Sequence, residues 1–165
     1  MREDDNHESD HEILEPLEHS ITEAQKDSVN AGYKILSYRS LAPDVYKSFV
    51  YASWLNGLRY GNDFFKLIDK DAYYASYHKY ITSVLSRRGS RLRIAVLSED
   101  EDVALGWSLD EGEILHYVFV KEDLRKNGIG RSLVDPKIKT FSHITKIGLS
   151  LWNDKMPNLK FNPFV

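Results

Sequence analysis

Apolar residues recur at two spacings along the chain, and these spacings predict its secondary structure. From residue 91 onward they alternate with polar residues, as at Leu92, Ile94 and Val96, which is typical of a half-buried strand. Between residues 41 and 88 they recur every three to four residues, which is typical of a helix with one buried face. We therefore expect strands over residues 34–40, 91–98, 103–109 and 113–120, and helices over residues 41–59 and 70–88.

The two expected helices differ in the residues on their apolar faces. The first should begin near Pro43 and Asp44, because proline fits the first turn of a helix and an acidic residue interacts favourably with its N-terminus. Its buried face should hold Val45, Phe49, Ala52 and Trp54. The second helix carries rows of tyrosines, namely Tyr73, Tyr74, Tyr77 and Tyr80. Such rows usually belong to the core, although tyrosine hydroxyls at their edge can line a substrate pocket.

The C-terminal segment is expected to be extended. Ile147, Leu149 and Leu151 alternate with other residues, which predicts a strand over residues 144–152. About a dozen residues follow it, which is enough for a loop or a single turn and one short strand.

A basic loop with two glycines follows the strand over residues 113–120 and carries the clearest chemical signal. Arg125, Lys126 and Arg131 surround Gly128 and Gly130, and a helix is expected to start at Ile129. The first amides of a helix lack partners and bind anions, and a glycine lets a ligand approach the backbone without meeting a Cβ. The pattern favours a phosphate or pyrophosphate site over the simpler alternative, a tight turn that binds nothing.

Two familiar phosphate loops do not fit this segment. A Walker loop has lysine where this chain has Arg131, and the dinucleotide fingerprint needs a third glycine where this chain has Leu133. Pro136 should limit the helix, because a proline inside a helix removes a hydrogen bond and clashes with the preceding turn, at about 3 kcal/mol. We expect a helix over residues 129–135, then a kink or a restart that carries Ile138 and Phe141.

The pattern Arg-x-x-Gly-x-Gly after a valine-rich strand resembles the acyl-CoA loop of the GNAT superfamily of N-acyltransferases, and the order of expected elements over about residues 34–152 resembles that fold. The resemblance implies an α/β (α+β) domain over residues 33–165, shortened at the C-terminus. Its central sheet would be mixed and mainly antiparallel, flanked by helices in the order β-α-α-β-β-β-α-β plus a short C-terminal strand. The implied activity is transfer of an acetyl group from acetyl-CoA to a primary amine, by direct attack in a ternary complex.

The resemblance also implies which residues bind coenzyme A. In the family, the loop amides hold the pyrophosphate, the preceding strand hydrogen-bonds the pantetheine arm, and a backbone N–H of that strand polarises the thioester carbonyl. Here Phe119 or Val120 would supply that N–H. The implied cofactor-binding residues are Val118, Phe119, Val120, Arg125, Lys126, Asn127, Gly128, Ile129, Gly130, Arg131 and Ser132.

A general base for the acceptor amine must come from a side chain or from water. His116 and Glu113 lie on the strand before the loop and are the candidates, with His116 the better match near neutral pH. The alternatives are a hydrogen-bonded sheet histidine and a solvated carboxylate, and a β-bulge would change how the two side chains are related. In the family a later helix often supplies a tyrosine that protonates the departing thiolate, but no tyrosine follows Tyr117 here.

Composition sets further bounds. With 165 residues, of which 42% are apolar, the chain is long enough for one domain with a real core. It contains no cysteine, which excludes disulfides, zinc–thiolate sites and a cysteine acyl-enzyme. No metal site is expected. No apolar run is long enough for a membrane span and no signal peptide is visible, so we expect a cytoplasmic protein.

Charge is distributed unevenly. Residues 1–32 hold ten acidic and two basic residues, a net charge of -8, which leaves +5 for the remainder because the whole chain has -3. The basic remainder suits an anionic cofactor and is too weak to favour nucleic acid. The acidic segment is expected to be disordered, to dock on a protein partner, or to cover the basic cleft of its own domain.

A different class of function stays open. A GNAT-fold module that binds coenzyme A, or serves a structural or interaction role, without turnover would fit the shortened C-terminus, the missing tyrosine and the acidic segment. Small trimmed versions of the fold occur in phage-encoded proteins. An open sheet edge after a short last strand would favour a homodimer.

Overall fold

The computed structural model describes residues 32–39, 43–156 and 158–165, so the acidic N-terminal segment lies outside the described residues. The elements, in chain order, are β1 (Tyr33–Arg39), α2 (Asp44–Gly61), α3 (Asp63–Lys66), α4 (Lys70–Ser86), β2 (Ser90–Leu97), β3 (Ala104–Glu111), β4 (Ile114–Val120), the 3₁₀ turn η1 (Glu122–Leu124), α5 (Ile129–Leu133), β5 (Thr140–Phe141), α6 (Lys146–Lys155) and β6 (Lys160–Phe161).

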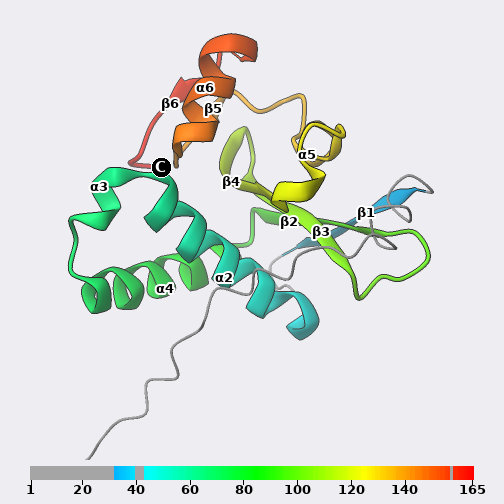
Figure 1. Ribbon diagram of the computed structural model, residues 1–165, viewed down its shortest axis with the longest axis horizontal. Coiled ribbons are helices and arrows are strands. Elements are labelled where there is room, and N and C mark those ends of the chain that lie inside the picture. Colours follow the sequence, from blue (N-terminus) through cyan, green and yellow to red (C-terminus); the bar gives the residue numbers. More distant parts are fainter. Residues whose placement is uncertain (1–31, 40–42, 157) are drawn as a thin grey trace, which may run out of the picture.

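The six described strands form one mixed sheet in the order of the chain, from β1 to β6 (Figure 1). Neighbouring strands from β1 to β4 are antiparallel, whereas β5 runs parallel to β4 and β6 runs parallel to β5. The change of direction follows from the connection through α5, which returns the chain to the same end of the sheet. The expected fold class, a mainly antiparallel mixed sheet flanked by helices, is therefore confirmed.

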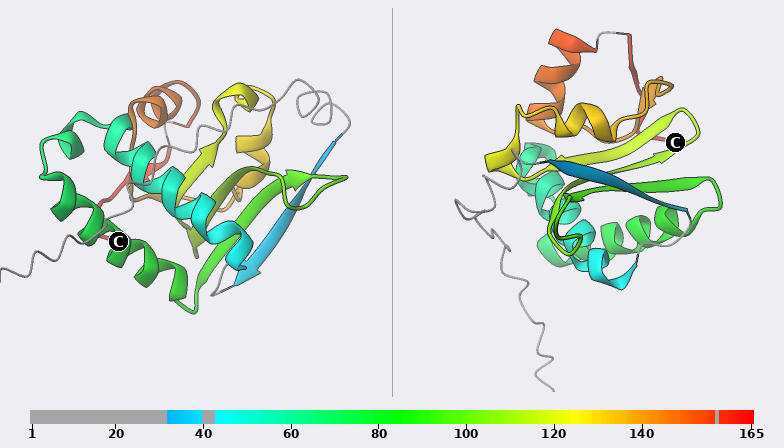
Figure 2. Two further views of the ribbon diagram at one scale, coloured as in Figure 1. Left: turned by 60° about the horizontal axis from the view of Figure 1, so that its bottom comes forward. Right: turned by 90° about the vertical axis from the view of Figure 1, so that its right-hand side faces the viewer.

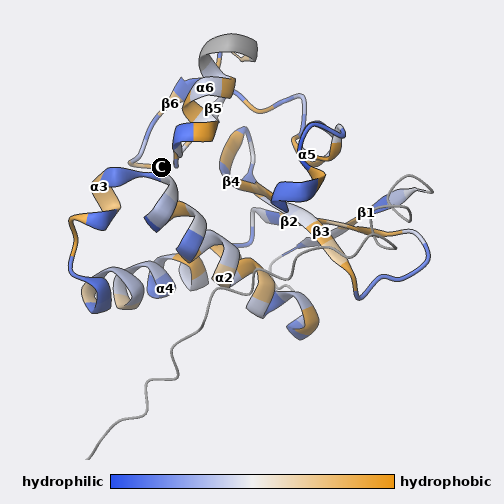
Figure 3. Cartoon of the chain, in the orientation of Figure 1, coloured by the Kyte–Doolittle hydropathy of each residue, from blue (hydrophilic) through white to orange (hydrophobic). Residues whose placement is uncertain are grey.

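Helices cover both faces of the sheet, but with unequal cores. Figure 2 shows α2 and α4 on one face and α5 and α6 toward the other. The first face buries an aromatic cluster in which the Trp54 ring lies 5.5 Å from Trp107 and 5.3 Å from Tyr117, between ring centroids. The other face has a smaller aliphatic cluster around Leu105, Ile129 and Leu133. Figure 3 shows β3 as largely hydrophobic and the turn that precedes it as hydrophilic.

The first expected helix is present, but part of its predicted buried face is wrong. Trp54 is buried as expected, whereas Val45 is 57% exposed. The residues of α2 that are buried against the sheet are Tyr46, Val50, Trp54, Leu55 and Leu58. Two apolar rows with helical spacing run along this helix, and only contact with the sheet selects one of them. The short helix α3 was not expected.

The strand expected over residues 144–152 is wrong, because this segment forms helix α6. Thr145 caps the helix, since its Oγ1 accepts a hydrogen bond from the Gly148 N–H at 3.1 Å. Ile147 and Leu151 lie four residues apart and share one helical face, so three alternating residues could not separate the two periods. The strand that follows α5 is instead the two-residue β5, and a helix stands between it and the last strand β6.

The helix after the basic loop is also shorter than expected. It ends at Leu133 rather than at residue 135, and Ile138 and Phe141 lie in a turn and in β5 instead of a second helical segment. The Leu133 carbonyl accepts hydrogen bonds from Arg93 at 3.0 Å and from Ser108 at 2.7 Å, so β2 and β3 satisfy the end of the helix.

A buried charge cluster under α5 fixes this helix to the sheet. Asp110 is 1% exposed and accepts hydrogen bonds from Arg91 at 3.0 Å and from Arg93 at 2.7 Å. Asp135, just beyond α5, accepts from the same two arginines at 2.7 and 2.8 Å. The backbone N–H of Lys137 and then Arg91 lower the pKa of Asp135. The two carboxylates compensate two arginines that would otherwise be costly to bury.

Candidate functional site

Strand β4 carries a β-bulge at His116. Leu109 pairs with Tyr117 and Asp110 pairs with Leu115, so His116 has no partner of its own on β3. A bulge bends a strand and re-aims the side chains around it. The bulge therefore decides toward which face of the sheet the His116 side chain points, and with it how His116 is related to Glu113.

Beyond the bulge, β4 parts from β5. Only Ile114 and Leu115 of β4 pair with β5, and the last contact of the pair is the Ser142 N–H donating to the Leu115 carbonyl at 3.0 Å. The chain then turns away into α6. In the described part of the chain, residues 116–120 of β4 consequently have no strand neighbour on that side.

The open edge of β4 presents the backbone groups of Val118 and Val120. The Lys121 N–H donates to the Leu105 carbonyl at 3.0 Å, so the alternating pattern of an antiparallel pair directs Phe119 toward β3 and its neighbours toward the open side. In agreement, the Val120 carbonyl accepts a hydrogen bond from Arg125 Nε at 3.2 Å. Of the two amides expected to polarise a thioester, that of Val120 faces the open side and that of Phe119 faces β3.

A cavity of about 140 Å³ lies where β4 and α6 diverge. Its β4 wall includes Tyr117 and Val118, and its α6 wall includes Ile147 and Leu151. These two α6 residues are 52% and 42% exposed, because the helix stands away from the strand instead of closing on it. The walls are mainly apolar, as suits the thin arm of a thioester ligand.

The loop between η1 and α5 forms a cradle of backbone amides. Lys126 and Gly128 have positive φ angles of 70° and 83°, which turn the backbone sharply before the helix begins. In the described structure no hydrogen bond uses the amides of residues 126–131, and the next amide, that of Ser132, donates to the Gly128 carbonyl. A Cβ at Gly128 would meet no atom within 4 Å, so the cradle is open to solvent. Successive unpaired amides around left-handed residues favour an anion.

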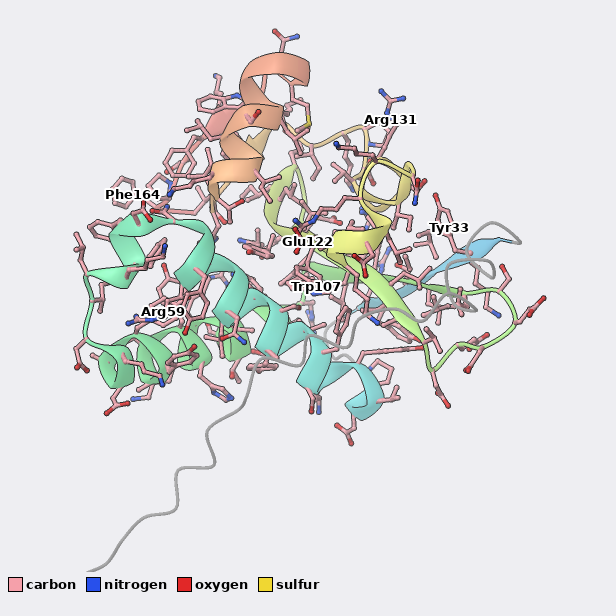
Figure 4. The ribbon with its side chains drawn as sticks, viewed as in Figure 1. Tyr33, Arg59, Trp107, Glu122, Arg131 and Phe164 are labelled. Atoms are coloured by element: carbon pink, nitrogen blue, oxygen red, sulfur yellow. The ribbon has the colours of Figure 1, made fainter. Side chains whose placement is uncertain are left out.

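The side chains expected to bind coenzyme A lie in different positions around this cradle. Arg131 points away from the body of the protein (Figure 4), and neither it nor Lys126 forms an ion pair with any described residue. Arg125 is held at β4 and lies 3.7 Å from Glu122. Asn127 is exposed, whereas the Ile129 side chain is buried, so Ile129 could act only through its backbone. Gly130 is partly exposed and follows directly.

The end of the cradle is tied to the first strand. Ser132 Oγ lies 2.8 Å from the Tyr33 hydroxyl of β1, and Figure 4 shows Tyr33 on the side of the sheet near α5. The Ser132 hydroxyl is therefore already engaged in a contact that fixes the helix against the sheet.

The two residues predicted as bases are not brought together. Glu113 is 54% exposed and lies 2.6 Å from Lys139 Nζ. It lines neither the cavity between β4 and α6 nor the second cavity, which is formed by α3, α4 and the C-terminal residues. His116 is fully buried: its Nδ1 lies 3.1 Å from Ser142 Oγ, and its Nε2 lies 3.5 Å from Glu111 Oε2 with no closer partner. Burial lowers the pKa of His116, and Glu111 opposes this effect. Their catalytic roles stay predictions.

A second histidine, His143, lines the cavity between β4 and α6, and the sequence did not single it out. His143 Nδ1 lies 2.8 Å from Ser142 Oγ, and its ring packs against Trp54 and Tyr80 at centroid distances of 5.6 and 5.2 Å. Burial, and then the charge of the nearby His116, lower the pKa of His143 to about 4, while the His116 backbone acts in the opposite direction. No sequence signal could have found it, because Ser142 and His143 belong to no motif and are placed by the pairing of β5.

A second and larger cavity, of about 290 Å³, lies on the other side of His143. Its walls come from α3, α4, the segment after β5 and the C-terminal residues: Asn62, Phe64, Phe65, Tyr77, Phe161 and Pro163, together with Ser142, His143 and Ile144. The expectation that tyrosines of the second helix could line a pocket is realised at Tyr77. Phe64 and Phe65, both in α3, contribute two further aromatic rings to the walls of this cavity.

Among the residues that the structure describes, no three His, Asp or Glu side chains are grouped in a way that could hold a metal ion. None of the described helices is both long enough and apolar enough to span a bilayer.

Comparisons with known proteins give a likeness at the level of structure only. No family model matches the chain, and no curated protein matches it. The observed arrangement, with its open β4 edge followed by a glycine loop and a helix, agrees with the order of elements that the sequence resemblance implied.

Several solved structures are similar to this chain. YjaB from Escherichia coli is 23% identical with a TM-score of 0.43, and the match covers 64% of this chain and 63% of YjaB, less than two thirds of its length. An aminoglycoside acetyltransferase from an uncultured soil metagenomic sample is 12% identical with a TM-score of 0.41, covering 81% and 78%. A GNAT-family acetyltransferase from Staphylococcus aureus Mu50 is 20% identical with a TM-score of 0.37, covering 62% and 61%. Such values say nothing about the substrate of this chain.

Proposed function

We propose that this protein is an N-acyltransferase that uses acetyl-CoA and transfers its acetyl group directly to an amine in a ternary complex. One observation carries the proposal: the open edge of β4 leads straight into the cradle of unpaired amides at residues 126–131. A ligand with an amide-containing arm and a pyrophosphate would find, in the same order, backbone partners for the arm and an anion site for the phosphates.

Each part of the ligand would meet groups of matching chemistry. The pantetheine arm would lie along β4 and hydrogen-bond the exposed backbone groups of Val118 and Val120. The pyrophosphate would accept hydrogen bonds from the amides around Gly128 and Gly130, with Lys126 and Arg131 adding positive charge at the rim. Arg125 would have to release the Val120 carbonyl or share it with the arm.

The reaction needs a polarised carbonyl and two reactants held in line. A backbone N–H on the open edge of β4, such as that of Val120, would stabilise the negative charge that develops on the thioester oxygen. The cavity between β4 and α6 would hold the thioester away from water and position it for attack. The amine nitrogen then forms the new C–N bond while the C–S bond breaks and coenzyme A departs.

The proposal is tested first by binding, through the shift in melting temperature that acetyl-CoA produces. A ligand that binds only the folded state stabilises it, by about 2.7 kcal/mol when the ligand concentration is a hundred times Kd. This stabilisation raises the melting temperature. Gly128→Asp should abolish this shift, because it places a carboxylate beside the pyrophosphate. Gly128→Asn is the matched control, since it has the same shape without the charge and asparagine tolerates a positive φ.

The outcomes separate the candidate functions. Equal shifts in the two Gly128 variants would show that the cradle does not hold the phosphates. If acetyl-CoA gives no shift in the unmodified protein, the proposal fails altogether. If it gives a shift but no thiol is released with any amine, the protein is the binding module that formed the alternative function.

A further inference from the structure

The cavity between β4 and α6 and the larger cavity beyond it share one wall, and His143 is part of that wall. His143 and Ile144 are the described residues that line both the cavity between β4 and α6 and the larger cavity beyond. Only His143 of this pair carries a titratable side chain. A group in the first cavity and a group in the second would therefore meet at the His143 ring.

The larger cavity is aromatic, and its described lining residues carry no permanent charge. Phe64, Phe65, Tyr77 and Phe161 line it, and none of its lining residues is Asp, Glu, Lys or Arg. The nearest carboxylate in sequence, Asp63, is already paired with Lys66 at 3.1 Å and with Lys146 at 2.6 Å. A ligand with several positive charges would lose its hydration here without gaining carboxylate partners.

The rings of this cavity are arranged for a flat apolar ligand rather than for a cation. Phe65 meets Phe64 and Tyr77 at centroid distances of 5.4 Å in each case, with interplanar angles of 80° and 85°. In each of these edge-to-face contacts the edge of one ring occupies a face of its neighbour, and such an occupied face is not open to a cation. An aromatic body can extend the same packing.

A chain of hydrogen-bonding groups orients the His143 ring. Glu111, itself 3.0 Å from Arg87, faces His116 Nε2 and favours a proton on that nitrogen. With that proton on Nε2, His116 Nδ1 is left to accept the hydrogen of the Ser142 hydroxyl at 3.1 Å, and Ser142 Oγ is left to accept the Nδ1–H of His143 at 2.8 Å. In this arrangement the other ring nitrogen of His143, Nε2, keeps its lone pair and can take a proton.

We propose that the larger cavity is the acceptor site, that it takes an arylamine, and that His143 accepts the proton which the amine nitrogen loses. This inference rests on the proposed acyltransferase function. As the nitrogen attacks the thioester carbonyl, the C–N bond forms and the C–S bond breaks. The nitrogen proton passes to His143 and then to solvent, and the departing thiolate takes up one proton from solvent.

The ring nitrogen of His143 and the nitrogen of an arylamine are both weak bases, so a proton can pass from one to the other. His143 is a weak base in its apolar surroundings, so it can relieve only a nitrogen that holds its proton weakly. An arylamine is neutral at neutral pH and needs no deprotonation before it attacks. An alkylamine is protonated there and would react only through its small neutral fraction.

The test compares coenzyme A thiol release from acetyl-CoA with p-toluidine, tyramine, spermidine and kanamycin as acceptors. We expect kcat/KM for p-toluidine to exceed that for the two polycations by at least about tenfold, because an unpaired buried charge is costly. The value for tyramine should rise with pH, following its neutral fraction, whereas that for p-toluidine should be nearly constant above pH 7. A preference for spermidine or kanamycin would overturn the assignment of the acceptor.

Two pairs of variants test the residues. His143→Gln should lower kcat about a hundredfold with p-toluidine and keep the melting shift with acetyl-CoA. Ser142→Ala, which removes only the orienting hydroxyl, should lower kcat less and leave KM unchanged. Phe64→Glu should reduce kcat/KM for p-toluidine about tenfold and raise it for spermidine. Leu67→Glu, with the same charge on an exposed residue that does not line the cavity, should change neither.

Failure of this inference can be told apart from failure of the proposed function. Absence of the acetyl-CoA melting shift in the unmodified protein removes the acyltransferase function and this inference with it. A normal melting shift with His143→Gln turnover within twofold of the unmodified protein, at every pH, would leave the transferase in place and overturn the role of His143.

Discussion

The two faces of the sheet are held together in different ways. On one face, α2 and α4 enclose a continuous aromatic cluster in which Trp54 contacts Trp107, Tyr117 and Tyr80. On the other, the five-residue α5 rests on a small aliphatic cluster and a group of buried charges, and α6 stands away from β4. The first face supplies stability, and the second, where packing and strand pairing stop early, supplies backbone groups and space for a ligand.

The largest effect is expected from breaking the aromatic face. Trp54→Ala should lower the free energy of unfolding by about 3–5 kcal/mol, because Trp54 is fully buried among other rings. Urea unfolding measures the loss. Val45→Ala, on the same helix but on its exposed side, should change stability by no more than about 0.5 kcal/mol. Similar costs for the two variants would contradict the described orientation of α2.

The charge cluster under α5 should come next. Asp110→Asn should cost about 3 kcal/mol, because it leaves Arg91 and Arg93 short of one buried carboxylate. Asp44→Asn removes the carboxylate of a solvent-exposed ion pair with Lys47 and should cost far less, because solvent screens that pair. Unfolding in urea at neutral pH distinguishes them, and an equally small loss for both would show that the cluster does not support this face.

The wall between the cavities should make stability depend on pH. His143 must stay neutral in the folded state down to about pH 4, whereas in the unfolded chain it takes up a proton below its ordinary pKa of 6.5. The unfolded state therefore binds more protons than the folded state between pH 6.5 and pH 4. The contribution of His143 to the free energy of unfolding is complete above pH 6.5 and falls by about 3 kcal/mol as the pH drops toward 4.

The comparison of the unmodified protein with His143→Gln isolates this contribution. The difference between their unfolding free energies should shrink as the pH falls from 7 to 4, since carboxylates titrate alike in both. A difference that stays constant over this range would mean that His143 is not held neutral by its surroundings.

The smallest effect concerns the contact between the cradle and β1. Tyr33→Phe removes the hydroxyl that meets Ser132 and should cost about 0.5–1 kcal/mol. Ser132→Ala should cost about the same, and the double variant should cost little more than either, because both changes break one hydrogen bond. Fully additive losses in thermal unfolding would show that the two hydroxyls do not interact.

Much of the fold could be predicted because its signals are local. The strands around Ile94 and Val118 and the long helices each repeat their period over seven or more residues, and the described elements follow them closely. The segment around Ile147 failed because three alternating residues fit both periods, and the Thr145 cap decided between them. The face of α2 could not be read correctly, since two rows had helical spacing and only the sheet distinguishes them.

The candidate site also has a part that local sequence predicts and a part that depends on contacts between distant segments. The glycine loop at residues 125–132 is contiguous, so its residue types alone predicted an anion site, and the structure adds the open amides. His143 could not be predicted, because its importance depends on two cavities whose walls come from α3, α4, α6 and β4. Glu113 and His116 were selected by their nearness in sequence to the loop, and a bulge and a surface ion pair place them differently.

The sequence by itself determined where the backbone is free to bind an anion, because glycines, a following helix start and basic neighbours act over a few adjacent residues. The short turns that join β2 to β3 and β3 to β4 also favour the pairing of those strands, whereas three helices separate β1 from β2. Only the tertiary structure decided where β4 loses its neighbour and that His143 lies between the two cavities. Those features depend on how far β5 pairs before α6 begins, which is a balance between distant segments that no local pattern records.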